Sequence, residues 1–382
     1  MKSPAHLRRP PKRAIDLNLI LREMSGKLPR TLDRFHCGRL FGRALRPLAL
    51  ALALLPLGRL PAAQPEAGEL RLGYFPNITQ AQALYGRATG EFERRVGARI
   101  KWTAFNAGPT AIEALFANAV DAAFVGPGPT INGFIKSRGE KLVIVAGSAS
   151  GGAGLVVRKD SAIRSDRDFA GKTIATPQFG NTQDLAARVW LQEKGYRLRE
   201  QGGNVSLVPL SNPDQITLFK KKQIDGAWTV EPWLSRLEME AGGEMFLDEK
   251  SLWPGGRYVS AHLVVRRAFL DDNQETMRKL IAALVEVTVR INSDKRAASA
   301  ILNEQLREET GKPLQDRVIQ RAMSRVEFTW DPICTSLRQS AEAAHRIGFL
   351  RKEAALEGIY ALSLLKGVLK ERHLPAIEEP RP

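Results

Sequence analysis

The sequence predicts an α/β protein with two lobes, a hinge and a central cleft, and a helical C-terminal part. Three observations lead to this fold class. Four short apolar strands in succession each end in a turn of Gly, Pro, Ser, Thr and Asn residues, and the same pattern restarts near Leu155. Everything after Asp271 has the spacing of helices. Such alternation is typical of a largely parallel sheet, in which ligands bind beyond the carboxyl ends of the strands.

The most informative turn follows a short apolar strand at 173–175. The turn contains a glycine that can adopt a positive φ, and Asn181 or Thr182 can cap the helix that comes next. There, unpaired backbone N–H groups and the positive end of a helix dipole favour a small anion. An ordinary strand-to-helix connection with a good cap is the alternative. Because similar turns recur along the chain, we take Asn181, Thr182 and Gln183 as the strongest candidates for ligand contact.

In the first lobe, a polar turn follows each expected strand. The strands are expected at 70–74, 100–104, 122–125 and 142–146. Backbone N–H groups and hydroxyls in the turns can approach a ligand closely. We therefore expect further ligand contacts from Asn77, Thr79, Gly128, Pro129, Thr130, Ser148, Ser150 and Gly151. Helix capping explains Thr79 equally well, and plain turn chemistry is the alternative for the others.

The second lobe repeats the pattern and has two tryptophans after one of its strands. Trp228 and Trp233 flank Glu231 at the end of a strand expected near 224–230. We expect Trp228 in the core and Trp233 as a wall of the pocket. Glu231 would repel an oxyanion within a few ångströms. It therefore either meets the ammonium group of an amino-sulfonate or forms a structural ion pair with Arg236 or another base, and we favour the ion pair.

Two crossings between the lobes are expected, near 151–155 and 258–263. They divide the chain into a first part of lobe 1 at 64–152, an inserted lobe 2 at 153–258, and a second part of lobe 1 with the C-terminal helices at 259–374. The helices are expected at 274–292, 297–309, 313–326, 334–347 and from Glu353 onward, before a frayed tail at 375–382. Two crossings between two α/β lobes form a hinge that can close around a small ligand.

Most of the positive charge lies ahead of the lobes. The formal charge is +16, but residues 1–63 hold 13 of the 57 Lys and Arg and only 3 of the 41 acids, which leaves +6 for the remainder. Basic residues lead into the apolar run 47–57, and small residues follow up to Ala63. This pattern predicts an export signal at 1–63 with a long basic n-region, removed near Ala63, and hence a periplasmic protein. A retained membrane anchor is the alternative.

The turns, in this order and spacing, resemble those of a known family. The carrying motifs lie at 70–79, 107–109, 120–129, 157–161, 171–184 and 223–233. They are similar to the periplasmic substrate-binding proteins of ABC importers, in the group for aliphatic sulfonates, nitrate and taurine, and the likeness covers 70–370. It implies a two-lobe periplasmic-binding fold, a small anionic solute, and delivery to a permease and its ATPase. Gly128 is a departure, because much of the group carries adjacent prolines at this turn.

We expect a monomer that binds its solute without cofactor, metal, nucleic acid or covalent chemistry. After removal of 1–63, three histidines and one cysteine, Cys334, remain, which excludes an intrachain disulfide. No His/Cys/Asp cluster has metal spacing, and no Gly-x-Ser-x-Gly occurs. These features disfavour the alternative of an enzyme on the same scaffold, related to the pyrimidine-precursor synthases. A ligand sensor that docks on a signalling partner stays open, because both roles use contacts on the lobe surfaces.

Overall fold

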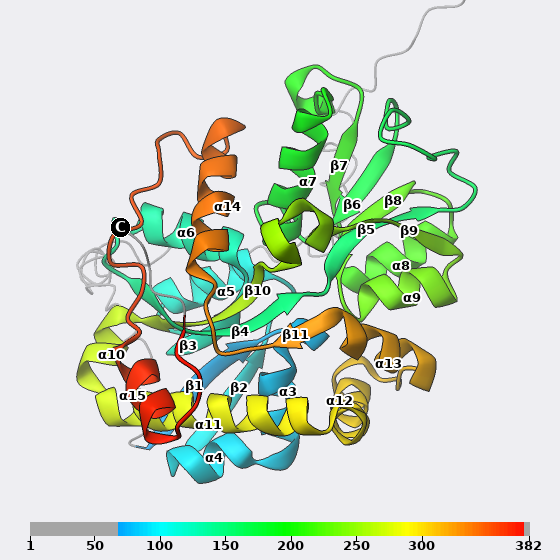
Figure 1. Ribbon diagram of the computed structural model, residues 1–382. Coiled ribbons are helices and arrows are strands. Elements are labelled where there is room, and N and C mark those ends of the chain that lie inside the picture. The colour runs from blue at the N-terminus through cyan, green and yellow to red at the C-terminus, as the bar shows by residue number, and fades with distance from the viewer. Residues whose placement is uncertain (1–67, 378–382) are drawn as a thin grey trace, which may run out of the picture. The chain divides into compact units, whose positions relative to one another are not determined.

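The computed structural model describes residues 68–377, which are coloured in Figure 1. The chain divides into two units, Met1–Leu60 and Pro61–Pro382, and the described residues all belong to the second. The export signal expected at 1–63 lies outside the described residues, as does the end of the expected tail at 378–382. Within the described range, no helix combines the length and the apolar character that crossing a membrane requires.

In the described part of the chain, the first sheet has six strands. They are β1 (Glu69–Tyr74), β2 (Arg99–Ala104), β3 (Ala122–Val125), β4 (Leu142–Gly151), β10 (Val259–Arg266) and β11 (Val326–Phe328). Their order across the sheet is β11-β4-β10-β3-β1-β2. β1 pairs in parallel with β2 and β3, whereas β10 runs antiparallel to β3 and β4, and β11 runs antiparallel to β4.

The second sheet, again counted within 68–377, has five strands. They are β5 (Ala153–Arg158), β6 (Thr173–Thr176), β7 (Ser206–Pro209), β8 (Gly226–Val230) and β9 (Gly243–Asp248), in the order β7-β6-β8-β5-β9. β6 is parallel to β7 and β8, but β5 is antiparallel to β8 and β9. Both sheets are therefore mixed, and the prediction of largely parallel sheets is wrong. β5 and β10, the first strand after each crossing from the other sheet, run antiparallel to their neighbours, β5 to β8 and β9 and β10 to β3 and β4.

Helices cover both faces of each sheet, so four apolar clusters form, two for each sheet. The helices between the strands of the first sheet are η2 (Ile78–Gln80), α3 (Ala81–Thr89), α4 (Glu91–Val96), α5 (Gly108–Phe116) and α6 (Pro127–Lys136). The second sheet carries α7 (Thr182–Glu193), η3 (Arg199–Gln201), α8 (Asn212–Lys220), α9 (Trp233–Glu240), η4 (Glu249–Leu252) and η5 (Pro254–Gly256). Figure 1 shows the helices of each set around their own sheet.

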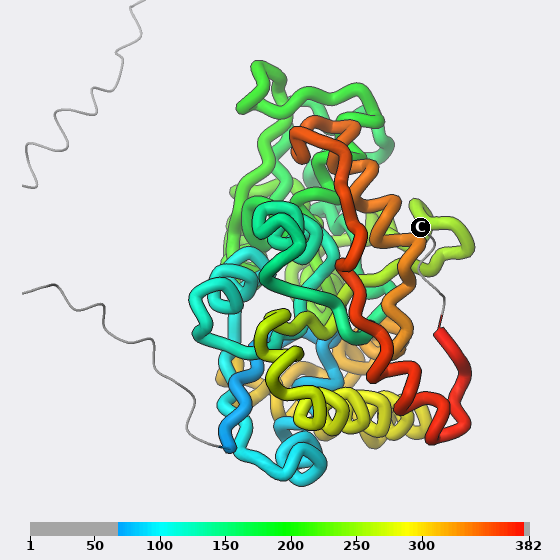
Figure 2. Tube along the Cα trace, turned by 90° about the vertical axis from the view of Figure 1, so that its left-hand side faces the viewer, coloured from blue at the N-terminus to red at the C-terminus, as the bar shows by residue number. Residues whose placement is uncertain are grey.

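The C-terminal part is helical, as the sequence predicts. Its helices are α10 (Arg267–Asp272), α11 (Gln274–Ser293), α12 (Lys295–Thr310), α13 (Asp316–Arg325), α14 (Cys334–Arg346) and α15 (Ser363–Glu371). α11 and α12 pack under the first sheet against α3 and α4, whereas α13 contacts α9 and α14 contacts both α6 and α7. Figures 1 and 2 show α14, in orange, running beside α7 of the second sheet. The C-terminal helices thus touch both halves of the molecule.

Two local predictions are wrong for identifiable reasons. The turn expected at 147–152 is strand as far as Gly151, because β4 continues to that residue while pairing with β10 and β11. The last helix begins at Ser363 and not at Glu353. The chain before it instead lies along β4, where the Ile144 N–H donates to the Ile359 carbonyl at 2.8 Å and the Ala361 N–H donates to the Ile144 carbonyl at 2.9 Å. β9 and β11 were not predicted.

A buried carboxylate ties three neighbouring strands of the first sheet together. Asp121 precedes β3 and is fully buried. Its oxygens accept from the Arg71 backbone N–H at 2.9 Å, from the Arg71 guanidinium at 2.6 Å and from Arg266 at 2.7 Å. Arg71 lies in β1 and Arg266 ends β10. Burial alone would raise the pKa of Asp121, but these hydrogen bonds outweigh it and hold the pKa below its usual value.

We expect Asp121→Asn to lower the free energy of unfolding by roughly 3 kcal/mol at pH 7, because two guanidinium groups lose their buried counter-charge. Since the folded-state pKa is lowered, this contribution is present above the ordinary Asp pKa of about 4 and is lost as the pH falls through the folded value. The gap between native and variant should therefore shrink in acid, which urea unfolding at several pH values measures. Glu304→Gln, at an exposed pair with Arg307, is the control and should change little. Equal stabilities of native and Asp121→Asn at pH 7 would contradict this account.

Candidate functional site

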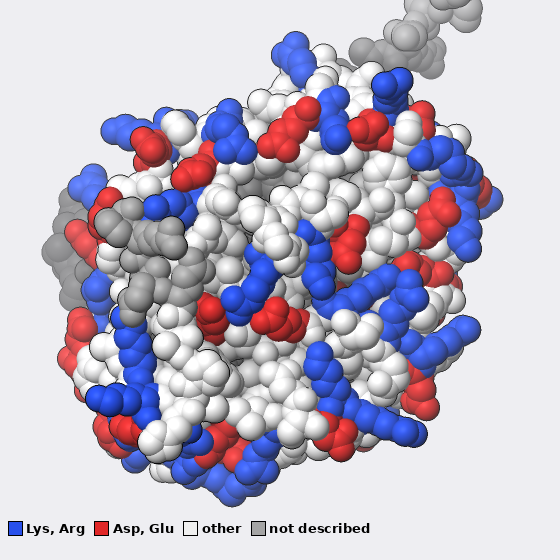
Figure 3. All heavy atoms as spheres, viewed as in Figure 1, with Lys and Arg blue, Asp and Glu red and all other residues white. Residues whose placement is uncertain are grey.

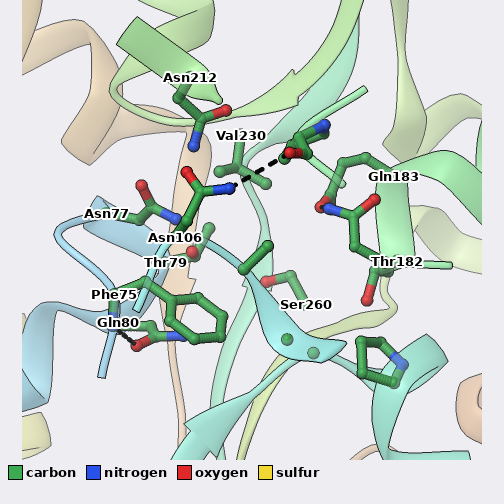
Figure 4. Close-up of a pocket in the computed structure, with 16 residues that line it drawn as sticks. Phe75, Asn77, Thr79, Gln80, Asn106, Thr182, Gln183, Asn212, Val230 and Ser260 are labelled. Carbon is green, nitrogen blue, oxygen red and sulfur yellow. Dashed lines mark hydrogen bonds between the residues drawn. The ribbon is translucent and has the colours of Figure 1, made fainter. Parts of the chain in front are cut away.

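A small pocket lies between the two sheets, at the carboxyl ends of their strands (Figure 4). Its volume is about 30 Å³, room for a group of a few atoms. Both halves of the fold contribute to its wall. The lining residues are Phe75, Asn77, Thr79, Gln80, Asn106, Ala107, Gly108, Gly126, Pro129, Pro177, Asn181, Thr182, Gln183, Asn212, Val230 and Ser260.

Four α-helices point their N-termini at this pocket. The N-cap residues Ala107 of α5, Gly126 of α6 and Asn181 of α7 line it, and so does Asn212, the first residue of α8. The first N–H groups of a helix have no intrahelical partner, and the helix dipole is positive at this end. α5 and α6 belong to the first sheet, whereas α7 and α8 belong to the second. The arrangement favours a negatively charged guest held from both sides.

Two amide side chains of the pocket present their N–H groups because partners fix their oxygens. The indole of Trp233 can only donate, and it donates to Asn77 Oδ1 at 2.8 Å, so the Asn77 NH₂ faces the other way. The Asp184 backbone N–H donates to Asn181 Oδ1 at 2.8 Å, so the Asn181 NH₂ donates to Gln183 Oε1 at 3.0 Å. The Gln183 NH₂ has no partner within the described residues. In Figure 4, Asn77 and Gln183 lie on opposite sides of the pocket.

Sequence reasoning missed four further polar residues of the pocket, namely Gln80, Asn106, Asn212 and Ser260. Asn212 Oδ1 accepts from the Thr229 hydroxyl at 2.9 Å, which leaves its NH₂ as a donor. The Ser260 hydroxyl is buried and has no hydrogen-bond partner among residues 68–377. Asn106 lies after β2 and donates across the pocket to the Pro177 carbonyl at 3.3 Å. Asn106 and Asn212 stand in the polar turns of the sequence, so their position after strands was the signal that could have found them.

The lining of the pocket contains no Asp, Glu, His, Lys or Arg. Ionisable side chains lie elsewhere, and on the face shown in Figure 3 the basic and acidic ones are interspersed. The field inside the pocket therefore comes from amide and hydroxyl dipoles and from the helix N-termini. Such a site can hold an anion by hydrogen bonds, but it offers no general acid or base for a reaction.

Six of the predicted site residues line the pocket, namely Asn77, Thr79, Pro129, Asn181, Thr182 and Gln183. The helix cap predicted at Asn181 or Thr182 is at Asn181. Gly128 does not line the pocket, but its N–H donates to Thr182 Oγ1 at 3.3 Å. A Cβ at neighbouring Gly126 would lie 2.4 Å from the same oxygen, so this turn needs glycine to approach α7. The turn at 126–130 and the turn at 178–183 thus meet across the cleft.

The expected contacts from Thr130, Ser148, Ser150 and Gly151 are not found in the pocket lining. The hydroxyls of Thr130, Ser148 and Ser150 have hydrogen-bond partners elsewhere. The Thr130 hydroxyl donates to the Gly126 carbonyl at 2.9 Å and the Ser148 hydroxyl donates to Gln82 Oε1 at 2.9 Å. The Ser150 hydroxyl accepts from the Tyr258 N–H at 3.3 Å. Because β4 continues through this segment, its side chains alternate into the packed layers and none reaches the cleft.

Glu231 and Trp233 also lie outside the lining. Glu231 is fully buried and accepts from Arg325 at 3.0 Å and from the Ser235 hydroxyl at 2.9 Å. The favoured structural ion pair is therefore present, although with Arg325 and not with Arg236. Trp233 is not a wall of the pocket, because its ring is buried and its nitrogen holds Asn77. Trp228 is a core residue as predicted, with 1% of its surface exposed.

Two mixed α/β halves, joined by direct strand crossings and enclosing a pocket of hydrogen-bond donors, define the class of two-lobe solute-binding proteins. Residues 63–303 match the model of the NMT1-like family, and the chain belongs to this family. The resemblance seen in the sequence is thereby confirmed.

Relatives of the chain are binding proteins by name. A putative binding protein of Brucella abortus (strain 2308) is 26% identical over 247 residues, 64% of this chain and 72% of that protein. The taurine-binding periplasmic protein of Escherichia coli (strain K12) is 24% identical over 225 residues, 59% of this chain and 67% of that protein. The solved structure of the alkanesulfonate-binding protein SsuA from Xanthomonas axonopodis pv. citri bound to MOPS has a TM-score of 0.66 at 19% identity, covering 79% of this chain and 100% of that one. This likeness confirms the two-lobe fold.

We expect Arg325→Met to lower the free energy of unfolding by roughly 3 kcal/mol at pH 7, because Glu231 stays buried without its cation. Burial raises the pKa of Glu231, and Arg325 opposes the rise. Without Arg325 the pKa rises further. Stability is then full below the ordinary Glu pKa of about 4.3 and is lost as the pH rises through the folded value.

The variant should therefore be most stable in acid, which urea unfolding between pH 4 and pH 8 tests. Arg236→Met is the matched control. Arg236 lies in α9, where its Nε pairs with Glu240 Oε2 of the same helix at 3.1 Å. It should cost under about 1 kcal/mol without this pH dependence. A free energy of unfolding of Arg325→Met that does not change with pH would show that the buried charge of Glu231 does not depend on Arg325.

Proposed function

We propose that this protein is the extracytoplasmic solute-binding component of an ABC importer. It captures a small oxyanionic solute, of the aliphatic sulfonate, taurine or nitrate class, by closing its two lobes and delivers it to a permease. The observation that carries the proposal is the pocket itself: four helix N-termini and amide N–H groups that face the pocket surround a space whose lining has no ionisable side chain. The taurine- and alkanesulfonate-binding names of relatives support the same solute class.

Donors without a counter-charge suit an anion that carries no proton. A sulfonate or nitrate offers only acceptor oxygens, which match the amide N–H groups of Asn77, Gln183 and Asn212. A protonated oxyanion would need an acceptor for its own O–H, and no carboxylate lines the pocket. Hydrogen bonds to a charged group contribute roughly 1.5–3 kcal/mol each, so a few of them suffice for binding.

We also propose an organisation of the chain and a role without catalysis. Residues 1–63 act as a removed export signal for the periplasm, and the lobes have bounds of 64–152 with 259–374, and 153–258. The protein works as a monomer and performs no catalysis. In support, His262 is buried away from the pocket, its Nε2 lies 3.1 Å from the Pro332 carbonyl, and burial lowers its pKa to about 4. Among residues 68–377, no group of three His, Cys, Asp or Glu could hold a metal.

A panel of anions tests the solute class. We expect a sulfonate or nitrate to raise the melting temperature of the purified full-length chain, since ligand at a hundred times its Kd stabilises the native state by about 2.7 kcal/mol. The panel contains methanesulfonate, taurine, nitrate, sulfate and bicarbonate, with thiamine precursors as neutral or cationic comparisons. A shift with the precursors alone, or no shift at all, would refute the proposal, and turnover of any ligand would refute the non-enzymatic role.

Gln183→Glu tests the donor role of the pocket amides. The substitution keeps the size of the side chain but replaces an N–H donor by a carboxylate oxygen that repels the anion. We expect the Kd for the bound anion to rise by about 30- to 150-fold, equivalent to roughly 2–3 kcal/mol. Gln192→Glu is the matched control, because it adds the same charge at an exposed position of the same helix. Titration calorimetry measures both, and equal effects of the two variants would mean that only net charge matters.

A further inference from the structure

One segment of the first lobe reaches across to the second lobe. α14 follows β11 of the first sheet, and the chain after α14 returns to β4, where Ile359 and Ala361 hydrogen-bond to Ile144. Both ends of the segment 334–361, here called the arm, are therefore fixed to the first lobe. The middle of the arm lies against α7 of the second lobe, as Figures 1 and 2 show. Residues 345–350, where α14 ends and the chain turns back, form the arm tip.

The backbone of the arm tip is held by its own hydrogen bonds. Gly348 has a φ of 73°, and its N–H donates to the His345 carbonyl at 2.9 Å. The Phe349 and Leu350 N–H groups both donate to the Ala344 carbonyl, at 3.0 and 3.1 Å. A glycine with positive φ and such bonds is the usual way to end a helix. The arm tip therefore presents the Phe349 side chain from a fixed backbone.

The Phe349 ring packs on the turn 178–183, which carries donors of the pocket. The centroid of the ring lies 6.0 Å from that of Phe179, with the planes 43° apart. A Cβ on Gly180 would lie 3.4 Å from Phe349 Cζ, so the ring also lies over the backbone of the turn. Phe179 is 58% exposed, and the Arg188 guanidinium lies 4.9 Å from its ring centroid. An aromatic contact thus joins the arm tip of one lobe to the ligand turn of the other.

The turn transmits this contact to the pocket because its own backbone is fixed. The Asp184 carboxylate accepts from the Gly180 N–H at 2.9 Å and from the Thr176 hydroxyl at 3.0 Å. The same carboxylate pairs with Arg188 at 2.8 Å. These bonds make the backbone of the turn and the pocket donors at 181–183 a single unit. A displacement of the turn at Gly180 would therefore displace the donors as well.

The first lobe holds this unit at three places. Two of them belong to the pocket: Asn106 donates to the Pro177 carbonyl, and the Gly128 N–H donates to the Thr182 hydroxyl. Both distances are 3.3 Å, which is long for a hydrogen bond. The third is Phe349, which does not line the pocket. Because the two polar contacts are long, the apolar contact of Phe349 has an important part in keeping the turn against the first lobe.

We propose that Phe349 is a positioning residue for anion binding: from the arm tip it holds the turn 178–183 in the closed arrangement and so raises the affinity of the pocket. The ring does not touch the anion. It favours the closed state by the same amount for every guest, so it sets the affinity and leaves the selectivity unchanged. This inference rests on the proposed function and adds a residue that acts from outside the pocket.

Phe349→Ala removes the ring. We expect the Kd of each anion that binds the native chain, among methanesulfonate, taurine and nitrate, to rise by one common factor of about three- to tenfold, the usual contribution of an aromatic pair. The increase should appear in the dissociation rate, because the closed complex is the state that loses a contact. Titration calorimetry on the full-length chain measures the Kd values, and stopped-flow tryptophan fluorescence measures the rates.

Two controls separate positioning from a general loss of packing. Phe116 is half-buried against the same apolar cluster as Phe349, but it ends α5, which packs on α6, β3 and β10 of the first lobe. Phe116→Ala should therefore lower the melting temperature of the unliganded chain and leave the Kd values within about twofold. Phe349→Tyr keeps the ring and should restore the native Kd values.

Phe179→Ala removes the partner ring at an exposed position, so it tests the same contact even if Phe349→Ala does not fold. It should also raise the Kd values, and Phe349→Ala should have a smaller effect in its background than in the native chain.

Native Kd values in Phe179→Ala and in a folded Phe349→Ala overturn this inference and leave the proposed function standing. A different factor for each anion also overturns it, since the ring would then select the solute. Failure of every anion of the panel to bind the native chain overturns both.

Discussion

The pocket depends on where an α/β sheet leaves the N-termini of its helices. When a strand runs into a helix, the first N–H groups of that helix stay unpaired at the carboxyl edge of the sheet. Here two such edges face each other, with α5 and α6 from one sheet and α7 and α8 from the other. Neither half alone supplies all four. The full set of donors exists only when the lobes meet, so ligand binding and closure are thermodynamically one event.

Closure also sets the direction of individual donors. Trp233 begins α9 of the second lobe, and its indole holds the oxygen of Asn77 from the first lobe. Parting of the lobes would break this bond and leave the Asn77 amide free to turn either face to the cleft. Gln183 differs, because Asn181 holds it within a single helix turn. One side of the pocket is thus preorganised, and the other becomes a donor surface as the halves approach.

The sequence predicted the fold class, the family and the part of the site that local rules control. Asn181 caps α7 because its short side chain can accept a hydrogen bond from a backbone N–H in the first turn of the helix. Such a cap depends only on neighbouring residues, so it can be predicted from the sequence. The segment 147–151 was misjudged because small polar residues suit a turn and a buried crossing strand equally, and only the pairing with β10 and β11 decides. Asn106 and Asn212 could have been found from their place in the polar turns, but Ser260 and the partner of Glu231 were out of reach for the same reason. Each of these two depends on residues that meet from distant parts of the chain.

The position of the ionisable groups explains how such a site can enclose an anion and still release it. Glu231 and Arg325 form their ion pair beside the pocket, where it joins the end of β8 to α13 and strengthens the closed arrangement without serving as the counter-charge of the guest. A cation inside the pocket would hold an anion even after the lobes part. Neutral dipoles lose most of their hold as soon as water enters, because their attraction depends on the low dielectric of the closed site. In the proposed role, affinity would therefore be tied to closure, and opening alone would suffice for delivery.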